Sequence, residues 1–100
     1  MDSFGNEIKE VAVWLYQNRE KQAYDWLQIH LGEIQTYLQR VLQKLENRHD
    51  ADLNLEQIAQ AAVITMRRIL QFYQQGKILE LADCIYYELL EFVKLEELYS

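Results

Sequence analysis

The sequence contains no proline, only three glycines and one cysteine among 100 residues. Because β-rich chains need many turns and usually mark them with proline or glycine, this scarcity argues against a β fold. The lone Cys84 has no partner for an internal disulfide. Its position beside an apolar stripe predicts a small, partly buried side chain rather than a reactive thiol. The sequence therefore predicts an all-α chain without disulfides.

Long hydrophobic runs are also missing. No run approaches the roughly 20 apolar residues that a helix needs to cross a bilayer. The first residues, Met1 to Glu7, are acidic rather than basic and then apolar, so we expect no secretion signal. These observations predict a cytoplasmic protein with no membrane partner.

Basic residues are scarce as well, since 10 Lys and Arg face 16 Asp and Glu, a net charge of −6. Phosphate neutralisation supplies most nucleic-acid affinity, so a nucleic-acid partner is not expected. The acidic excess is concentrated in residues 77–100, at Glu80, Asp83, Glu88, Glu91, Glu96 and Glu97. This pattern favours a solvated acidic face over a docking site for a basic partner.

Half of the residues are apolar and 12% are aromatic, a composition that folds rather than stays disordered. The length of the chain allows a single helical domain over residues 1–100.

The clearest helical pattern runs from residue 53 to residue 98. Asn54 and Gln57 form a capping box, and Leu53 and Ile58 are placed to form a hydrophobic staple. Apolar or small residues then recur at steps of three and four, at Ile58, Ala62, Thr65, Met66, Ile69, Phe72 and Tyr73.

The first half of the chain carries a similar seam. A helix is predicted to begin near residues 4–7, and the polar stretch 17–22 interrupts its apolar face before the spacing resumes at Tyr24. With no obvious turn residue in that stretch, the pattern favours one continuous helix. A short break between Asn18 and Lys21 is the alternative.

The polar segment 46–52 predicts the loop between two helices of nearly equal length, about 6–48 and 54–98. Such helices joined by a short loop form a long antiparallel hairpin. Gly76 predicts a kink or break in the second helix, because glycine commonly ends helices in the left-handed conformation.

After Gly76 the apolar face is too wide for contact with a single neighbouring helix. Two hairpins that pair into a four-helix bundle account for this second stripe, so a homodimer is predicted. A monomeric three- or four-helix bundle with breaks near 20 and 76 is the competing interpretation. The residues predicted at the interface are Trp14, Trp26, Tyr37, Ile85, Tyr86, Leu89, Phe92 and Val93.

Two pairs have the spacing of ligands in di-iron bundles, Glu46 with His49 and His30 with Glu33. The inward positions are filled by aliphatic and aromatic residues, so surface histidines are favoured and no metal or cofactor is expected. No arrangement of a nucleophile with a base is recognisable, which predicts that the chain is not an enzyme. A metal- or small-ligand-binding bundle using these four residues is the alternative function.

The segment from Gly76 to Phe92 resembles the closing segment of small, uncharacterised helical proteins of Gram-positive bacteria. The overall plan also resembles flagellar export chaperones, which hold an amphipathic helix of another protein against an apolar bundle face. The resemblance implies an all-α interaction protein.

Taken together, these patterns predict a non-enzymatic protein–protein interaction module, adaptor or chaperone-like. It self-associates through apolar helix faces and can bind another protein through an amphipathic helix. A nucleic-acid regulator ranks third because of the charge.

Overall fold

The computed structural model of the protein describes residues 3–48 and 54–99, and it confirms the all-α prediction. Its elements are α1 (Ser3–Tyr16), α2 (Glu20–Arg48), α3 (Leu55–Gln75), α4 (Ile78–Asp83), the π-helical η1 (Cys84–Leu89) and α5 (Leu90–Tyr99). The last three elements follow one another without a gap and form a single helical rod. The described residues therefore build a bundle of four rods.

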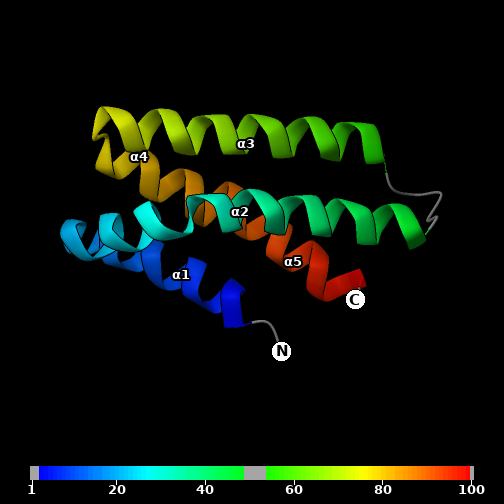
Figure 1. The fold of residues 1–100 in the computed structure, drawn as a ribbon, viewed down its shortest axis with the longest axis horizontal. Helices are drawn as coiled ribbons and strands as arrows, with labels where there is room; N and C mark the ends of the chain where they lie inside the picture. Colours follow the sequence, from blue (N-terminus) through cyan, green and yellow to red (C-terminus); the bar gives the residue numbers. More distant parts are fainter. Residues whose placement is uncertain (1–2, 49–53, 100) are drawn as a thin grey trace.

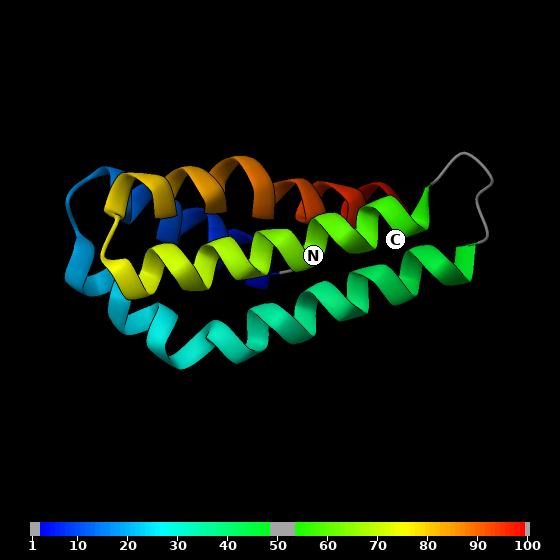
Figure 2. The same cartoon turned by 90° about the horizontal axis from the view of Figure 1, so that it is seen from above.

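The rods run up and down in chain order (Figures 1 and 2). The turns α1–α2 and α3–α4 lie together at one end, and the end of α2 and the start of α3 lie at the other. α2 packs beside α3 and α1, while α4 and η1 pack between α1 and α3, and α5 packs on α2. The last rod thus contacts all three others, as its wide apolar face predicts.

The prediction of one continuous helix over 6–48 is wrong, and the alternative of a break near Asn18 is correct. Asn18 adopts the left-handed conformation, with φ of 62°. The Arg19 N–H donates to the Trp14 carbonyl at 2.8 Å, and the Asn18 N–H donates to the Leu15 carbonyl at 3.4 Å. These two bonds form a Schellman motif, which ends α1 and turns the chain back.

The predicted break at Gly76 is confirmed, and it uses the same motif. Gly76 has φ of 67°, and the Lys77 N–H donates to the Phe72 carbonyl at 3.0 Å. The cap at Asn54 is also confirmed, because its side chain accepts a hydrogen bond from the Gln57 N–H at 3.1 Å. Leu53, the other half of the expected staple, lies outside the described residues.

The core runs along the axis of the bundle and takes residues from every rod. On the last rod it includes Leu81, Ile85 and Leu89, which are at most 1% exposed. Both apolar stripes of this rod are therefore largely covered by the chain itself. The fold of the single chain is the four-helix bundle that the sequence left as the competing interpretation, and a second hairpin is not needed to bury the stripes.

Small residues bring α1 close to the last rod. Ala12 and Ala82 are fully buried, and a Cβ atom added to Gly5 would lie 2.8 Å from Val93 Cγ1. A buried polar cluster joins α2 to α5, where Glu96 accepts from the Tyr37 hydroxyl at 2.8 Å and from Lys44 Nζ at 2.9 Å. The last rod is thus packed closely on α1 and is joined to α2 by satisfied polar groups. A hollow of about 250 Å³ remains between α1 and the last rod, and its lining includes the charged Lys9, Lys94 and Glu97.

Candidate functional site

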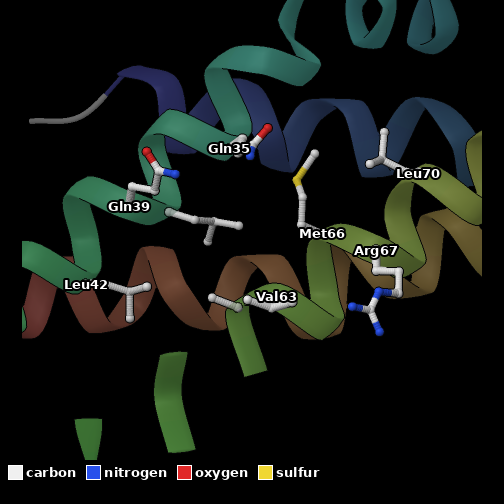
Figure 3. Close-up of a pocket in the computed structure, with 9 residues that line it drawn as sticks. Gln35, Gln39, Leu42, Val63, Met66, Arg67 and Leu70 are labelled. Atoms are coloured by element: carbon white, nitrogen blue, oxygen red, sulfur yellow. The ribbon is translucent and has the colours of Figure 1, made fainter. Parts of the chain in front are cut away.

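A groove of about 320 Å³ lies between α2 and α3 (Figure 3). We call it the α2–α3 groove. It is lined by Gln35, Leu38, Gln39, Leu42, Ala62, Val63, Met66, Arg67 and Leu70. All nine lining residues belong to α2 and α3, two antiparallel helices that pack side by side. The groove is therefore open to a further element.

Helical spacing explains why the groove is mainly apolar. Leu38 and Leu42 are four residues apart on α2, and Ala62 and Met66 are four apart on α3, so each pair lies on one face of its helix. Leu38 and Ala62 are buried, while Leu42 and Met66 are half-buried. Together they form a continuous apolar floor between the two helices.

The walls of the groove expose more apolar surface. Val63 is 57% exposed and Leu70 is 37% exposed, and Ile64, the neighbour of Val63 on the outer face of α3, is 51% exposed. Single exposed aliphatic residues are ordinary, but a contiguous set beside a groove is typical of an interaction surface. This part of α3 is the best candidate for a binding surface.

The hollow surface continues toward the α2–α3 connection. A second hollow of about 270 Å³ shares Leu42 with the groove and is also lined by Glu46, Leu55, Glu56 and Ala59. A third hollow, of about 390 Å³, lies on the outer face of α3 and is lined by Glu56, Ala59, Gln60, Val63 and Ile64. The small side chain of Ala59 contributes to both. The open surface therefore extends along most of α3.

The charges along this surface are separated. Arg67 lies in the α2–α3 groove on the half nearer the end of α3, and Glu46 and Glu56 line the hollow near the start of α3. The polar side chains between them are uncharged glutamines, Gln35 and Gln39. The surface thus has a positive end and a negative end.

Most of the residues predicted at an interface lie inside the chain. Tyr37, Ile85, Leu89, Phe92 and Val93 are all buried, at no more than 6% exposed. In this fold these five side chains belong to the core of the single chain.

The remaining three are partly accessible and pack on aromatic neighbours. Trp26 lies 4.3 Å from His30, centroid to centroid, and both are near Phe4 of α1. Tyr86 is 38% exposed and packs edge-on against Tyr16. Trp14 is half-buried against the core. None of the three lines the α2–α3 groove.

Four of the six acidic residues of the last rod are exposed, in agreement with the solvated face that the sequence predicts: Glu80, Asp83, Glu91 and Glu97. Asp83 accepts a hydrogen bond from the Tyr16 hydroxyl, Glu88 pairs with Arg68 at 2.6 Å, and Glu96 is buried in the polar cluster described above. Half of the six acidic residues named from the sequence thus hold the rod to α1, α2 and α3.

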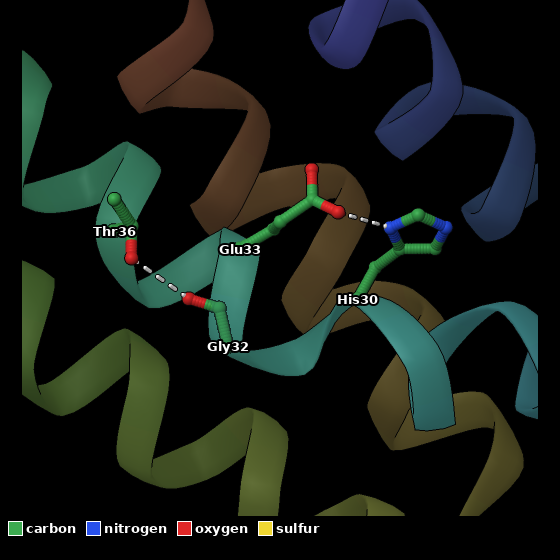
Figure 4. Close-up of polar contacts among 4 residues, drawn as sticks. All are labelled: His30, Gly32, Glu33 and Thr36. Carbon is green, nitrogen blue, oxygen red and sulfur yellow. Dashed lines mark hydrogen bonds and ion pairs between the residues drawn. The ribbon is translucent and has the colours of Figure 1, made fainter.

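The histidine–glutamate pairs do not assemble a metal site in the described part of the chain. His30 Nδ1 lies 2.7 Å from Glu33 Oε1 on α2, one turn apart, and beside them the Thr36 hydroxyl donates to the Gly32 carbonyl (Figure 4). His49 lies outside the described residues. Across residues 3–48 and 54–99, no group of three or more His, Cys, Asp or Glu side chains is placed to hold a metal ion.

Cys84 is a buried structural residue, 1% exposed, whose Sγ lies 3.9 Å from the Thr65 carbonyl. Burial, together with the nearby Glu88 carboxylate, raises its pKa to about 12. A thiol with such a pKa stays protonated near neutral pH and is a poor nucleophile. The sequence-based interpretation of Cys84 as a small hydrophobe therefore agrees with its environment.

The α2–α3 groove was missed by the sequence analysis. Val63, Ile64 and Leu70 lie off the stripe that runs from Ile58 to Tyr73, and the width of the apolar surface was considered only for other segments. Counting apolar residues off the main stripe is the signal that finds them.

None of the helices described here is long and apolar enough to cross a membrane. The chain matches no known protein family, no curated protein and no solved structure.

Proposed function

We propose that the chain is a non-enzymatic protein–protein interaction module that holds an amphipathic helix in the α2–α3 groove. The observation that carries this proposal is the continuous apolar floor of Leu38, Leu42, Ala62 and Met66 beside the exposed Val63. An amphipathic helix laid into such a groove buries apolar surface on both partners.

The dimensions of the surface suit a helix. The lining runs along α3 from Leu55 to Leu70, about 23 Å at 1.5 Å per residue. Four turns of a bound helix cover this length. The small Ala59 and Ala62 allow its backbone to approach closely.

The polar lining supports binding rather than catalysis. Gln35 and Gln39 offer amide groups, which donate and accept hydrogen bonds, and Arg67 offers a guanidinium, which donates them. These groups are suited to hydrogen bonding and ion pairing at the rim of an interface. We also place the module in the cytoplasm, since its single thiol forms no internal disulfide. The same mode of helix binding is implied by the resemblance to export chaperones.

The proposal can be tested by placing a photocrosslinking amino acid at position 39, in place of Gln39, and irradiating the cells in which the protein is made. Gln22 is the matched control, because it is an exposed glutamine of the same helix that does not line the groove. We expect covalent protein adducts from position 39, few from position 22, and loss of the adducts when Val63→Asp places a charge in the groove wall. Equal labelling from both positions, or labelling unaffected by Val63→Asp, contradicts the proposal.

A further inference from the structure

We propose that the helix that fills the α2–α3 groove is α3 of a second copy of this chain, in antiparallel orientation. This inference rests on the proposed function and names its partner. A two-fold axis perpendicular to α3 then relates the copies, and each copy supplies both the groove and the helix that fills it. The shared element is the α2–α3 hairpin, so the four helices α2 and α3 of the two copies form a second bundle.

The outer face of α3 has the pattern of an inserting helix. Glu56, Gln60, Val63 and Arg67 follow one another at steps of three and four, with Ile64 beside them, and all five are exposed. They therefore share one face. Its centre is apolar and its two ends carry opposite charges. This arrangement fits a pairing of the face with itself.

Antiparallel pairing brings the charges together. When Glu56 faces Arg67 of the second copy, symmetry places Arg67 against Glu56 of the second copy, which gives two ion pairs at the ends of one interface. Among the described residues neither Glu56 nor Arg67 forms an ion pair within the chain. Both charges are thus available to a partner.

The neighbouring Arg68 shows the contrast. It pairs with Glu88 at 2.6 Å and lies over the Phe72 ring at 5.6 Å. One arginine of the adjacent pair therefore fixes α3 to the last rod. The other is left in the α2–α3 groove, where the second copy presents a carboxylate.

The same register also fits the shape of the surface. With Glu56 opposite Arg67, Ile64 comes opposite Ala59 of the second copy, and Val63 comes opposite Gln60. The hollow of about 390 Å³ on the outer face of α3 is lined by Ala59 and Gln60, among others. The exposed Ile64 of each copy thus faces the hollow beside the small Ala59 of the other copy.

Charge complementarity favours the second copy over an unrelated helix. Any helix in this position must be apolar at its centre, acidic near Arg67 and basic near Glu56. The outer face of α3 in an antiparallel second copy meets these requirements, because it places its Glu56 near Arg67 and its Arg67 near Glu56. The net charge of −6 opposes association, so the local pairs must decide whether copies pair.

Reversal of the two charges tests the inference by light scattering of the purified protein over a range of concentrations. We expect the wild type to reach twice the chain mass at high concentration. Arg67→Glu and Glu56→Arg each place like charges at both ends of the interface, so each should weaken dimerisation at least tenfold. The double variant restores opposite charges and should restore the dimer. Arg19→Glu is the control. It changes the net charge by the same amount as Arg67→Glu, but it lies in the α1–α2 turn outside the proposed interface, so it should leave the dimer intact.

Far-ultraviolet circular dichroism checks that every variant keeps the helicity of the wild type. A wild-type dimer that is indifferent to both single reversals, or no rescue in the double variant, overturns the inference. A wild-type monomer at all concentrations also overturns it. In that case, adducts to a different protein from position 39 leave the proposed function standing, and the absence of adducts removes both.

Discussion

The two sides of the bundle are built from similar antiparallel helices, yet one is closely packed and the other carries an open apolar groove. On the closely packed side, α1 approaches α5 so closely that Gly5 has no room for a methyl group beside Val93, and the hollow that remains there is lined in part by the charged Lys9, Lys94 and Glu97. On the open side, Val63 and Ile64 remain more than half exposed although they are as apolar as Val93. The difference teaches that composition does not decide whether a helix face belongs to the core. The number of rods packed against the face decides it.

The largest expected effect comes from the same substitution on the two sides. Ile85→Ala removes a fully buried side chain of η1 and should lower the free energy of unfolding by roughly 2–5 kcal/mol, because it leaves a cavity. Ile64→Ala removes an exposed side chain of α3 and should change the free energy of unfolding by no more than about 0.5 kcal/mol. Urea unfolding at low protein concentration measures both. Equal losses would mean that the comparison is mistaken.

A smaller effect is expected from two glycines. Gly5→Ala forces its Cβ against Val93 Cγ1, a β-branched and buried neighbour, and overpacking of this kind costs about 1–3 kcal/mol. Gly32→Ala meets no atom within 4 Å and should stabilise α2 by about 0.5–1 kcal/mol. Thermal unfolding followed by circular dichroism should give shifts of opposite sign. Stabilisation by both alanines would show that α1 and α5 are not closely packed.

The smallest expected effect near neutral pH is the effect of Cys84 ionisation on the free energy of unfolding. Burial raises the pKa of Cys84 from 9.0 to about 12, so the unfolded chain ionises first. Its contribution to stability is fully present below pH 9 and is lost as the pH rises toward 12. Desolvation also raises the pKa of Tyr16 and of Tyr24, with the same sign.

Cys84→Ala removes one of these groups. The loss of unfolding free energy between pH 8 and pH 10.5 should therefore be shallower in this variant than in the wild type. Urea titrations at the two pH values measure it. If the two proteins lose stability in parallel, the thiol does not ionise in the unfolded state alone.

Much of the fold follows from the sequence, because its determinants are local. The cap at Asn54 and the glycine turn at Gly76 are set by the stereochemistry of single residues, and both were predicted. The turn at Asn18 was only the alternative to a continuous helix. Asparagine enters the left-handed conformation less often than glycine, and its propensity alone does not distinguish a turn from a solvated helical position. Its place in the polar stretch 17–22 was the available signal.

The candidate site was harder to predict, because it depends on which helices are neighbours. Ile85, Leu89 and Phe92 have the character of interface residues, and so do Val63 and Ile64. The packing of α1, α2 and α3 on the last rod separates the two groups, and the return of α1 follows from the turn at Asn18. The preference for a continuous helix at this turn therefore placed the expected surface on the last rod and not on α3.

The two Schellman turns also bear on how the chain folds. Each joins helices that are consecutive in sequence, α1 with α2 and α3 with α4, and both lie at the same end of the bundle (Figure 1). Closing such short loops loses little chain entropy, so each hairpin can form before distant segments meet. Bundles dominated by local contacts of this kind fold within microseconds to milliseconds. We therefore expect the docking of the two hairpins, which buries the last rod against α1, to be the slower step.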